Sequence, residues 1–431
     1  MKLKNIKVLA VSLVALGAAG ALASCGSETG TSIVVWAPTE EQAVIDEVVK
    51  EYNKTAEYKI NYKFTAVSEA DGGTTLGNDP QVKNAPALVA AADDHIFGLA
   101  QKKIAQKLPT AWKNFVLESN TEVAIKGASY NGDVYGFPIS TDNGYFLYYN
   151  KEVIKESDKG TLEGILAACK KANKKFRMDL ANGWYVNSIP QAQGITGTES
   201  LSFTADADGI AIYNIGWDTE ISAKAFKAVS ELINVTYKDT LIMGADDVMT
   251  GGFQDESVVA GVSGTWMQPA LEKAIGAENL GACKLPTFNV EGTAHQMASF
   301  TGTKVYVINK YRPSEEQRMA ADLGKLLTSK EAQLVRFRLR NSLPCNKEAL
   351  LDPAYTENIS LGGAALVEQN QFAAVQSQSA EGRYWDVGKA MGQAIYDGKL
   401  AEGESAGTTH TVAEWKAFLE TQCNSLRKSG K

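Results

Sequence analysis

The pattern that most constrains the fold of this chain is a strand, a helix and a second strand in immediate succession near its beginning. Residues 32–36 form a short apolar run rich in β-branched side chains, which predicts a strand buried on both faces. Apolar residues then recur at helical spacing from Ile45 to Tyr52, and residues 58–66 alternate apolar and polar side chains as a strand does. A βαβ unit favours a parallel sheet, and the sequence therefore predicts an α/β fold.

Strand and helix patterns continue to alternate along the rest of the chain. Short apolar runs predict strands at residues 87–91, 146–149, 258–262 and 304–308, and helical patterns cover residues 314–339 and about 383–428. Thr39 and Gln42 fit a capping box at the start of the first helix. The glycine-rich segment 71–77 predicts a loop.

Three polar residues, Asp93, Asp94 and His95, directly follow the predicted strand at 87–91. In open α/β sheets, ligands bind in the crevice outside the carboxyl ends of the strands. These residues are therefore candidates for a binding site. The alternative is a solvated turn that caps the next helix.

The beginning of the chain has the organisation of a secretory leader. Three lysines precede an uncharged, mostly apolar run at residues 8–22, which is too short to span a bilayer. Residues 22–25 (Leu-Ala-Ser-Cys) resemble a bacterial lipobox, which implies that residues 1–24 are removed and that Cys25 carries a lipid. The alternative is an ordinary secretory signal with an incidental cysteine. Residues 25–31 then form a flexible tether, and the protein is expected on the extracellular face of the bacterial cytoplasmic membrane.

The size and charge of the chain limit the number of domains and the kinds of partner that we expect. The chain has 431 residues and a formal net charge of −7, and the 407 residues left without residues 1–24 are enough for two or three domains. Because the leader holds three lysines and no acidic residue, its removal changes this charge to −10. Such a charge argues against nucleic acid or an anionic lipid surface as the main partner.

Cysteine and histidine are too sparse to indicate metal binding. Apart from Cys25 there are four cysteines, Cys169, Cys283, Cys345 and Cys423, and no two lie at metal-ligand spacing. They either form one or two disulfides or remain isolated thiols. With three histidines in the chain, the sequence predicts no metal site and no cofactor.

Two sequence motifs resemble those of a known family. The first runs from Tyr130-Asn131-Gly132 through residues 135–139 to residues 147–151, and the second is Leu285-Pro286-Thr287-Phe288. With these motifs, the segments at 35–52, 90–108 and 261–288, and the C-terminal helices, the chain resembles the solute-binding proteins of ABC importers. The resemblance is to the maltose and maltodextrin branch.

This resemblance implies two α/β lobes joined by a hinge, with a ligand cleft between them. The chain would cross between the lobes more than once. Lobe 1 would comprise residues 31–139 plus 301–345, lobe 2 residues 143–298 plus 347–431, and the hinge crossings residues 140–142, 299–300 and 346. Closure of such lobes converts ligand binding into a shape that a membrane permease can select.

The resemblance also implies a set of polar and aromatic binding residues. They are Glu40, Glu41, Asp94, His95, Asp142, Asn143, Trp184, Tyr185, Trp266, Tyr384, Trp385 and Lys389. Aromatic faces would pack against sugar rings, and carboxylates and amides would hydrogen-bond the hydroxyl groups. Of the other tryptophans, Trp36, Trp112 and Trp415 are predicted to be core residues, whereas the sequence does not decide the role of Trp217.

Two classes of function remain open from the sequence. The first is a monomeric, lipid-anchored carrier that captures an oligosaccharide, a maltooligosaccharide by resemblance, and delivers it to an ABC import permease. The second is a glycan-active lipoprotein hydrolase that uses Asp94 and Asp142 as paired carboxylates. A carrier for a peptide or another non-sugar solute is a further alternative.

Three other motifs have weaker support. Residues 403–407 match G-x-S-x-G with His410 close behind, but no buried strand precedes them, so a loop is predicted. Tyr148 and Tyr149 could bind ferric iron as paired phenolates, although the resemblance favours tyrosines packed in or beside a strand. The segment 206–209 partly resembles a calcium-binding loop but lacks the later ligands of an EF-hand, so an acidic surface loop is predicted.

Overall fold

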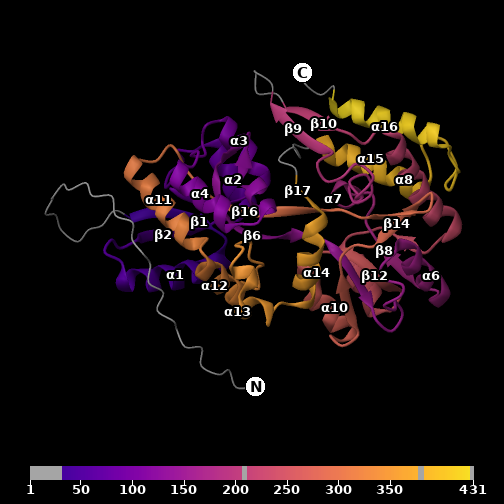
Figure 1. The fold of residues 1–431 in the computed structure, drawn as a ribbon, viewed down its shortest axis with the longest axis horizontal. Coiled ribbons are helices and arrows are strands. Elements are labelled where there is room, and N and C mark those ends of the chain that lie inside the picture. The colour runs from indigo at the N-terminus through magenta and orange to yellow at the C-terminus, as the bar shows by residue number, and fades with distance from the viewer. Residues whose placement is uncertain (1–31, 206–210, 377–382, 428–431) are drawn as a thin grey trace.

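The computed structural model describes residues 32–205, 211–376 and 383–427. Cys25 and the whole candidate calcium loop at 206–209 lie outside these residues. The chain forms two α/β lobes that lie side by side, with helices around a sheet in each (Figure 1). The predicted α/β fold with two lobes is thereby confirmed.

The first lobe is built on a six-stranded sheet that contains the predicted βαβ unit. Its strands are β1 (Ser32–Ala37), β2 (Asn61–Ala66), β3 (Leu88–Ala92), β6 (Gly136–Gly144), β16 (Ser299–Ile308) and β17 (Ala373–Val375). The order is β17-β16-β3-β1-β2, and β6 also pairs with β16. As expected, β1 is parallel to both β2 and β3, whereas β16 runs antiparallel to β3 and β6.

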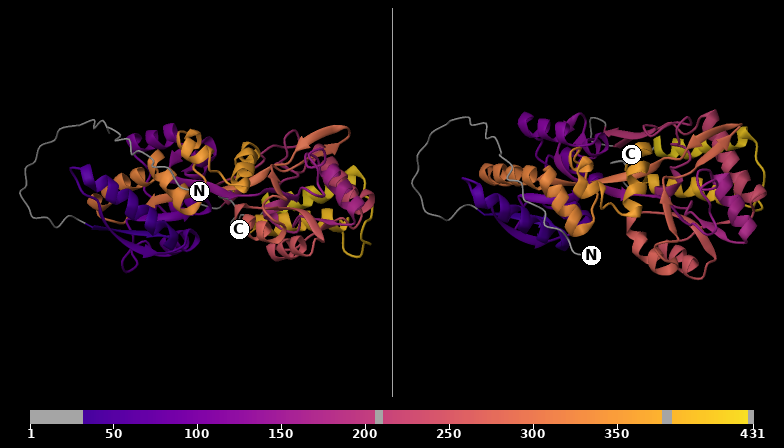
Figure 2. Two further views of the ribbon diagram at one scale, coloured as in Figure 1. Left: turned by 90° about the horizontal axis from the view of Figure 1, so that it is seen from below. Right: turned by 60° about the horizontal axis from the view of Figure 1, so that its bottom comes forward.

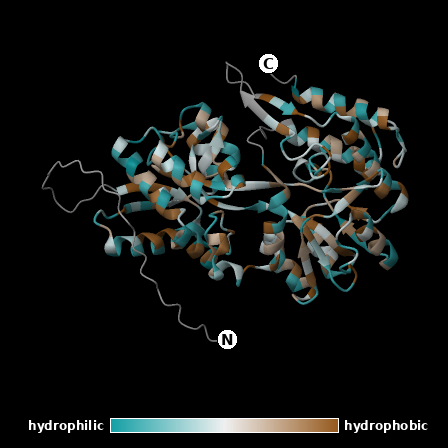
Figure 3. Ribbon diagram, viewed as in Figure 1, coloured by the Kyte–Doolittle hydropathy of each residue, from teal (hydrophilic) through white to brown (hydrophobic). Residues whose placement is uncertain are grey.

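Helices cover this sheet and fill the spaces between its strands. They are α1 (Gln42–Thr55), α2 (Glu69–Asn78), α3 (Ile96–Gln101), α4 (Thr110–Ser119), α5 (Glu122–Gly127), α11 (Ser314–Leu327) and α12 (Lys330–Arg340), with a small hairpin of β4 (Ser129–Tyr130) and β5 (Asp133–Val134). Figure 3 shows hydrophobic and hydrophilic residues alternating along many helices, as expected for helices that pack one face on a sheet.

The second lobe has its own sheet, with strand order β11-β8-β12-β7-β13. The strands are β7 (Phe146–Asn150), β8 (Lys175–Arg177), β11 (Leu241–Ile242), β12 (Val258–Ser263) and β13 (Leu280–Cys283). Two hairpins flank it: β9 (Leu201–Ala205) with β10 (Ala211–Ile215), and β14 (Thr287–Val290) with β15 (Thr293–Gln296). Its helices are α6 (Leu162–Ala172), α7 (Gly183–Val186), α8 (Glu220–Glu231), α9 (Asp246–Gln254), α10 (Gln268–Ile275), α14 (Leu361–Gln369), α15 (Arg383–Asp397) and α16 (Val412–Arg427).

Within the described residues the chain passes between the two lobes repeatedly, and the last strand, β17, returns to the first sheet after α14. The chain leaves the first sheet in β6 and enters the second in β7 one residue later, and it returns through β16. After α12 it crosses again through α13 (Pro353–Thr356) to α14, which packs on β7 and β13. In Figure 2, β6 and β16 extend along the long axis of the molecule between the lobes.

Each lobe has a separate hydrophobic core. Trp36 lies in the first core and Trp415 in the second, so their predicted core roles are confirmed. Trp217 is fully buried in the second core, and Trp112 packs partly buried against the first. No helix in the described ranges is long and apolar enough to cross a bilayer.

Two local predictions are wrong. The segment 71–77, predicted as a loop, belongs to α2, whose Ser68 N-cap accepts a hydrogen bond from the Asp71 N–H. Its glycines allow close packing, because a Cβ on Gly72 would lie 2.9 Å from the Ala90 carbonyl oxygen and one on Gly73 would lie 2.3 Å from the His95 ring. The predicted capping box at Thr39 is absent, because residues 39–41 form a 3-10 turn that begins after Pro38 without a side-chain cap.

Candidate functional site

The carboxyl end of β3 places the three polar residues Asp93, Asp94 and His95 in a 3-10 turn, but in different environments. Asp93 is fully buried and accepts a hydrogen bond of 3.0 Å from the Thr303 N–H of β16. The Asp94 side chain is 36% exposed, and its Oδ1 lies 3.8 Å from His95 Nε2 without a hydrogen-bond partner. Asp93 therefore joins two strands, whereas the Asp94 side chain is partly exposed with its buried Oδ1 beside the His95 ring.

Replacing Asp93 with asparagine should raise the free energy of unfolding at neutral pH by about 1 kcal/mol. Burial is the largest influence on this carboxyl group and raises its pKa well above the ordinary value, and the charge of Asp94 acts in the same direction. The folded wild type therefore holds a proton more tightly than the unfolded chain and loses stability as pH rises between the two pKa values. The amide of asparagine can still accept the Thr303 hydrogen bond.

Urea unfolding of both proteins at several pH values would test this prediction. The free energy of unfolding of the asparagine variant should exceed that of wild type by an amount that grows as pH rises from acidic to neutral. A variant that is less stable at neutral pH, or an advantage independent of pH, would contradict it.

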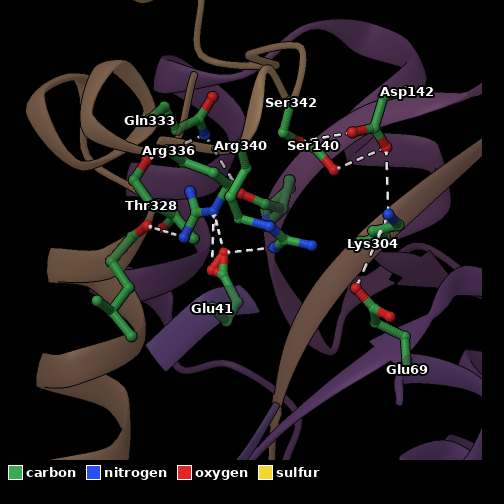
Figure 4. A network of polar contacts seen from close by, with 12 residues as sticks. Glu41, Glu69, Ser140, Asp142, Lys304, Thr328, Gln333, Arg336, Arg340 and Ser342 are labelled. Atoms are coloured by element: carbon green, nitrogen blue, oxygen red, sulfur yellow. Dashed lines mark hydrogen bonds and ion pairs between the residues drawn. The ribbon is translucent and has the colours of Figure 1, made fainter. Parts of the chain in front are cut away.

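Glu41 belongs to a sealed ion-pair network between η1 (Thr39–Glu41) and α12 (Figure 4). Arg336 Nε donates to Glu41 Oε1 at 2.5 Å, and Arg340 Nη1 lies 3.0 Å from the same oxygen. Glu41 and Arg336 are each 1% exposed. Burial, the largest single influence, would raise the pKa of Glu41, but the charges and hydrogen bonds of the two arginines together lower it below its ordinary value.

Asp142 forms a second, more open polar network on the crossing strand β6 (Figure 4). Its carboxylate accepts hydrogen bonds from Ser140 Oγ at 3.1 Å and Ser342 Oγ at 2.5 Å. Lys304 Nζ of β16 lies 3.6 Å from Asp142 Oδ1 and 3.8 Å from Glu69 Oε1. Burial acts to raise the pKa of Asp142, but the Lys304 charge and the serine hydrogen bonds outweigh it, so the pKa is lowered.

The second lobe gathers aromatic side chains near the point where β16 enters it. The Trp184 ring centroid lies 5.4 Å from that of Phe300 and 6.3 Å from that of Trp385. Both tryptophans are partly buried and pack against the second core. Helices α7 and α15 approach closely behind them, because a Cβ on Gly388 would lie 2.8 Å from the Gly183 Cα.

Trp266 occupies a different place, at the carboxyl end of β12. Its side chain is 46% exposed, and its Nε1–H donates a 2.8 Å hydrogen bond to Asp246 Oδ2. Asp246 in turn accepts from Ser263 Oγ at 2.9 Å and lies 3.6 Å from Arg177 Nη1. The buried Arg177 guanidinium also lies over the Tyr185 ring, 5.5 Å from its centroid. The indole of Trp266 is therefore held in place against Gly264, and nearly half of the residue stays exposed.

The structure distributes the predicted binding residues between solvent and core. Glu40 and Lys389 are exposed, and the partly buried Asn143 donates from Nδ2 to Gln376 Oε1 at 3.3 Å. Glu41, Tyr185 and Tyr384 are buried, and the Tyr384 hydroxyl donates to the Gly183 carbonyl at 2.8 Å. In this conformation the polar or aromatic groups of these three side chains are engaged inside the protein, and their role as ligand contacts stays a prediction.

A pocket of about 440 Å³ lies at the crossing between the lobes, and no predicted binding residue lines it. Its lining includes Thr141 of β6, Lys126 of α5, Pro344 and Asn370. Lys126 also forms a 2.7 Å ion pair with Glu199 of the second lobe. The predicted ligand residues therefore lie outside this pocket.

Several competing motifs lose support from the geometry. Residues 403–407 form a loop, as predicted, in which Glu404 accepts from the Leu400 N–H and lies 3.4 Å from His410 Nε2. Tyr148 and Tyr149 are buried neighbours on β7, and successive side chains of a strand point to opposite faces. Burial raises the pKa of both phenols, which disfavours the phenolates that iron would need.

The four cysteines of the described residues are free thiols, which settles the open alternative against disulfides. Burial is the largest influence on each and raises the pKa of each thiol to about 12. Within the described ranges, no group of three or more histidine, cysteine, aspartate or glutamate side chains could hold a metal ion.

Two α/β lobes with several chain crossings, and with polar and aromatic groups at the strand ends beside them, define a periplasmic-binding-protein-like fold. A family model described as bacterial extracellular solute-binding protein matches residues 47–362. The chain belongs to this family.

Known proteins agree with this assignment. A maltooligosaccharide ABC transporter solute-binding lipoprotein of Streptococcus pneumoniae serotype 4 is 26% identical over 420 residues, which cover 91% of this chain and 92% of the relative. A maltodextrin-binding protein from L. casei superposes with a TM-score of 0.76 at 18% identity, covering 93% of this chain and 100% of that one. The maltose-binding protein of Listeria monocytogenes gives 0.72 at 16% identity, covering 93% and 99%. At these identities the two structures support the fold alone.

Proposed function

We propose that this protein is a lipid-anchored, non-catalytic carrier that binds a maltooligosaccharide outside the cell and delivers it to an ABC import permease. The observation that carries the proposal is the 46% exposure of Trp266, whose N–H is already bonded to Asp246. Such a surface suits the C–H face of a sugar ring. The partly exposed Trp184 and Trp385 would add further platforms, as a ligand of several rings requires.

Polar groups of the first lobe supply the complementary chemistry. Asp94 lies at the end of β3 with its side chain 36% exposed, and Asp142 lies on the crossing strand β6. Carboxylates accept hydrogen bonds from sugar hydroxyls, and a missing partner in a desolvated site costs about 1–3 kcal/mol. The sugar named for the pneumococcal relative, a maltooligosaccharide, favours an α-glucan over other glycans. The leader and the lipobox at residues 22–25 favour membrane anchoring.

The carboxylates fit binding better than hydrolysis. A glycosidase needs one carboxyl group with a raised pKa to protonate the leaving oxygen. Asp142 has a lowered pKa, held there against its burial by Lys304 and by two serine hydroxyls. It therefore stays ionised and suits a hydrogen-bond acceptor.

A thermal-shift series on the purified mature protein would test this proposal. Maltotriose and longer maltodextrins should raise the melting temperature in a concentration-dependent manner, because ligands that bind only the folded state stabilise it by mass action. Cellobiose, xylooligosaccharides and a peptide mixture are the controls for other carriers. No shift with any maltooligosaccharide would refute the choice of ligand, and new shorter reducing ends on prolonged incubation would refute the absence of catalysis.

A further inference from the structure

We infer that Glu69, Lys304 and Asp142 form a polar subsite that binds neighbouring hydroxyl groups of one sugar ring, with Lys304 as its donor. This inference rests on the proposed function and adds two residues that the sequence did not single out. The three side chains come from three different segments: the start of α2, the strand β16 and the strand β6.

The fold brings these side chains to the edge of the first sheet where a ligand is expected. Lys304 pairs in register with Ala92, the last residue of β3, and with Ser140 of β6. Glu69 follows the end of β2 by three residues. All three residues therefore lie near the carboxyl ends of the parallel strands, outside which ligands of such sheets bind.

The distances leave the ammonium group with free hydrogen-bonding capacity. Lys304 Nζ lies 3.6 Å from Asp142 and 3.8 Å from Glu69, beyond the usual hydrogen-bond range of about 2.7–3.2 Å. Charge attraction holds Lys304 between the two carboxylates. An ammonium group has three N–H donors, and at these distances they are not fully used. The Asp142 charge, the largest influence, raises the pKa of Lys304, and the group stays protonated.

Exposure distinguishes this triad from the neighbouring arginine network. The side chains of Lys304, Glu69 and Asp142 are 30%, 17% and 14% exposed, whereas those of Glu41 and Arg336 are each 1% exposed. Figure 4 shows Lys304 between the two carboxylates, apart from the closed contacts of Glu41. The Glu41–Arg336 pair is sealed, whereas Arg340 is 16% exposed and Lys304 is 30% exposed, so the triad can exchange solvent for ligand.

A ring with adjacent hydroxyl groups matches this arrangement chemically. Each hydroxyl both donates and accepts a hydrogen bond, so one can donate to a carboxylate while its neighbour accepts from the ammonium. The triad has a net charge of −1 and therefore favours a neutral polyol over an anionic ligand. Lys304 is also the only charged residue in the ten-residue strand β16, which is otherwise almost entirely buried.

Calorimetry with maltotriose and its monodeoxy derivatives would test the subsite. Lys304→Met should weaken maltotriose binding about tenfold to hundredfold, as expected for losing hydrogen bonds to a charged group. Lys107→Met is the matched control, because Lys107 forms a 2.7 Å ion pair with Asp133 at an exposed place outside the site. The affinity of this variant for maltotriose should equal that of wild type. Glu69→Gln is a second variant that keeps side-chain volume, and it should also weaken binding.

The deoxy sugars separate contact from support. Wild type should bind at least one monodeoxy maltotriose more weakly than maltotriose, and Lys304→Met should bind these two sugars equally. Equal weakening of all sugars in both variants, with a lower melting temperature of the unliganded protein, would assign the triad a structural role and overturn the inference. Unchanged affinity in both variants would also overturn it while leaving the proposed function intact. If wild type binds no maltooligosaccharide, the proposed function itself fails.

Discussion

Replacing Arg336 with methionine should lower the free energy of unfolding by about 3 kcal/mol. The substitution removes the hydrogen bonds of 2.5 and 3.1 Å to Glu41 and the bond of 3.1 Å to the Leu327 carbonyl. Because Glu41 is 1% exposed, its carboxylate would stay buried with Arg340 as its remaining partner. That partner places the expected loss at the lower end of the range for breaking a buried ion pair.

Equilibrium unfolding in urea would measure this loss, and Arg338→Met supplies the control. Arg338 lies on the same helix and pairs with Glu47, but both side chains are about half exposed, so its removal should change stability little. A loss for Arg336→Met no larger than that of the control would contradict the prediction.

The pH dependence of the Arg336 variant provides a second measurement. In wild type the pKa of Glu41 lies below its ordinary value, so its stabilising contribution is present above the unfolded pKa and disappears as pH falls through the folded pKa. In the variant, burial is expected to outweigh Arg340 and raise the pKa of Glu41. The difference in stability between the two proteins should therefore shrink as pH falls.

Replacing Trp266 with alanine should weaken maltooligosaccharide binding by about 1–3 kcal/mol, the size expected for the loss of an aromatic platform. The melting temperature of the unliganded protein should change little, because the side chain is 46% exposed and contributes little to the core. Calorimetry with maltotriose would measure the change in Kd.

Tyr311→Ala is the control for exposed aromatic surface. Tyr311 is 48% exposed and follows the far end of β16, away from the chain crossings. Its removal should leave the affinity unchanged. Equal affinities for wild type and Trp266→Ala would show that Trp266 is not a platform. Trp385→Ala should also weaken binding. It should in addition lower the melting temperature of the unliganded protein, because Trp385 packs against Tyr384 with 5.1 Å between the two ring centroids.

The sequence predicted the strands better than the details around them. The apolar run at 32–36 and the alternation at 58–66 correspond to β1 and β2, because buried strands carry their signal in consecutive residues. The helix at Glu69–Asn78 was missed because its glycines read locally as a loop. These glycines are needed for a tertiary contact, because α2 must approach Ala90 and His95 closely. A local sequence pattern carries no information about that contact.

The candidate site was predictable by residue type but not by environment. Asp94 and Trp266 are at least partly exposed at strand ends, where the resemblance placed them. Glu41 and Tyr384 have the same chemistry but are buried, because Arg336 and the Gly183 carbonyl meet them from segments distant in sequence. Lys304 was overlooked as part of a strand pattern, although a lone charge before an apolar run was a usable signal.

The first sheet pairs strands that are far apart in the sequence and are therefore synthesised at different times. β3 lies between β1 and β16, and Asp93 and Thr303, which are joined by a hydrogen bond, are 210 positions apart in the chain. During synthesis the opening half of the polypeptide thus lacks one of its inner strands until most of the chain has emerged. We expect this delay to slow the collapse of the first lobe, because long-range pairing must close a large loop. A precursor that folds late can still pass unfolded through a membrane translocation channel, which suits the export that we propose.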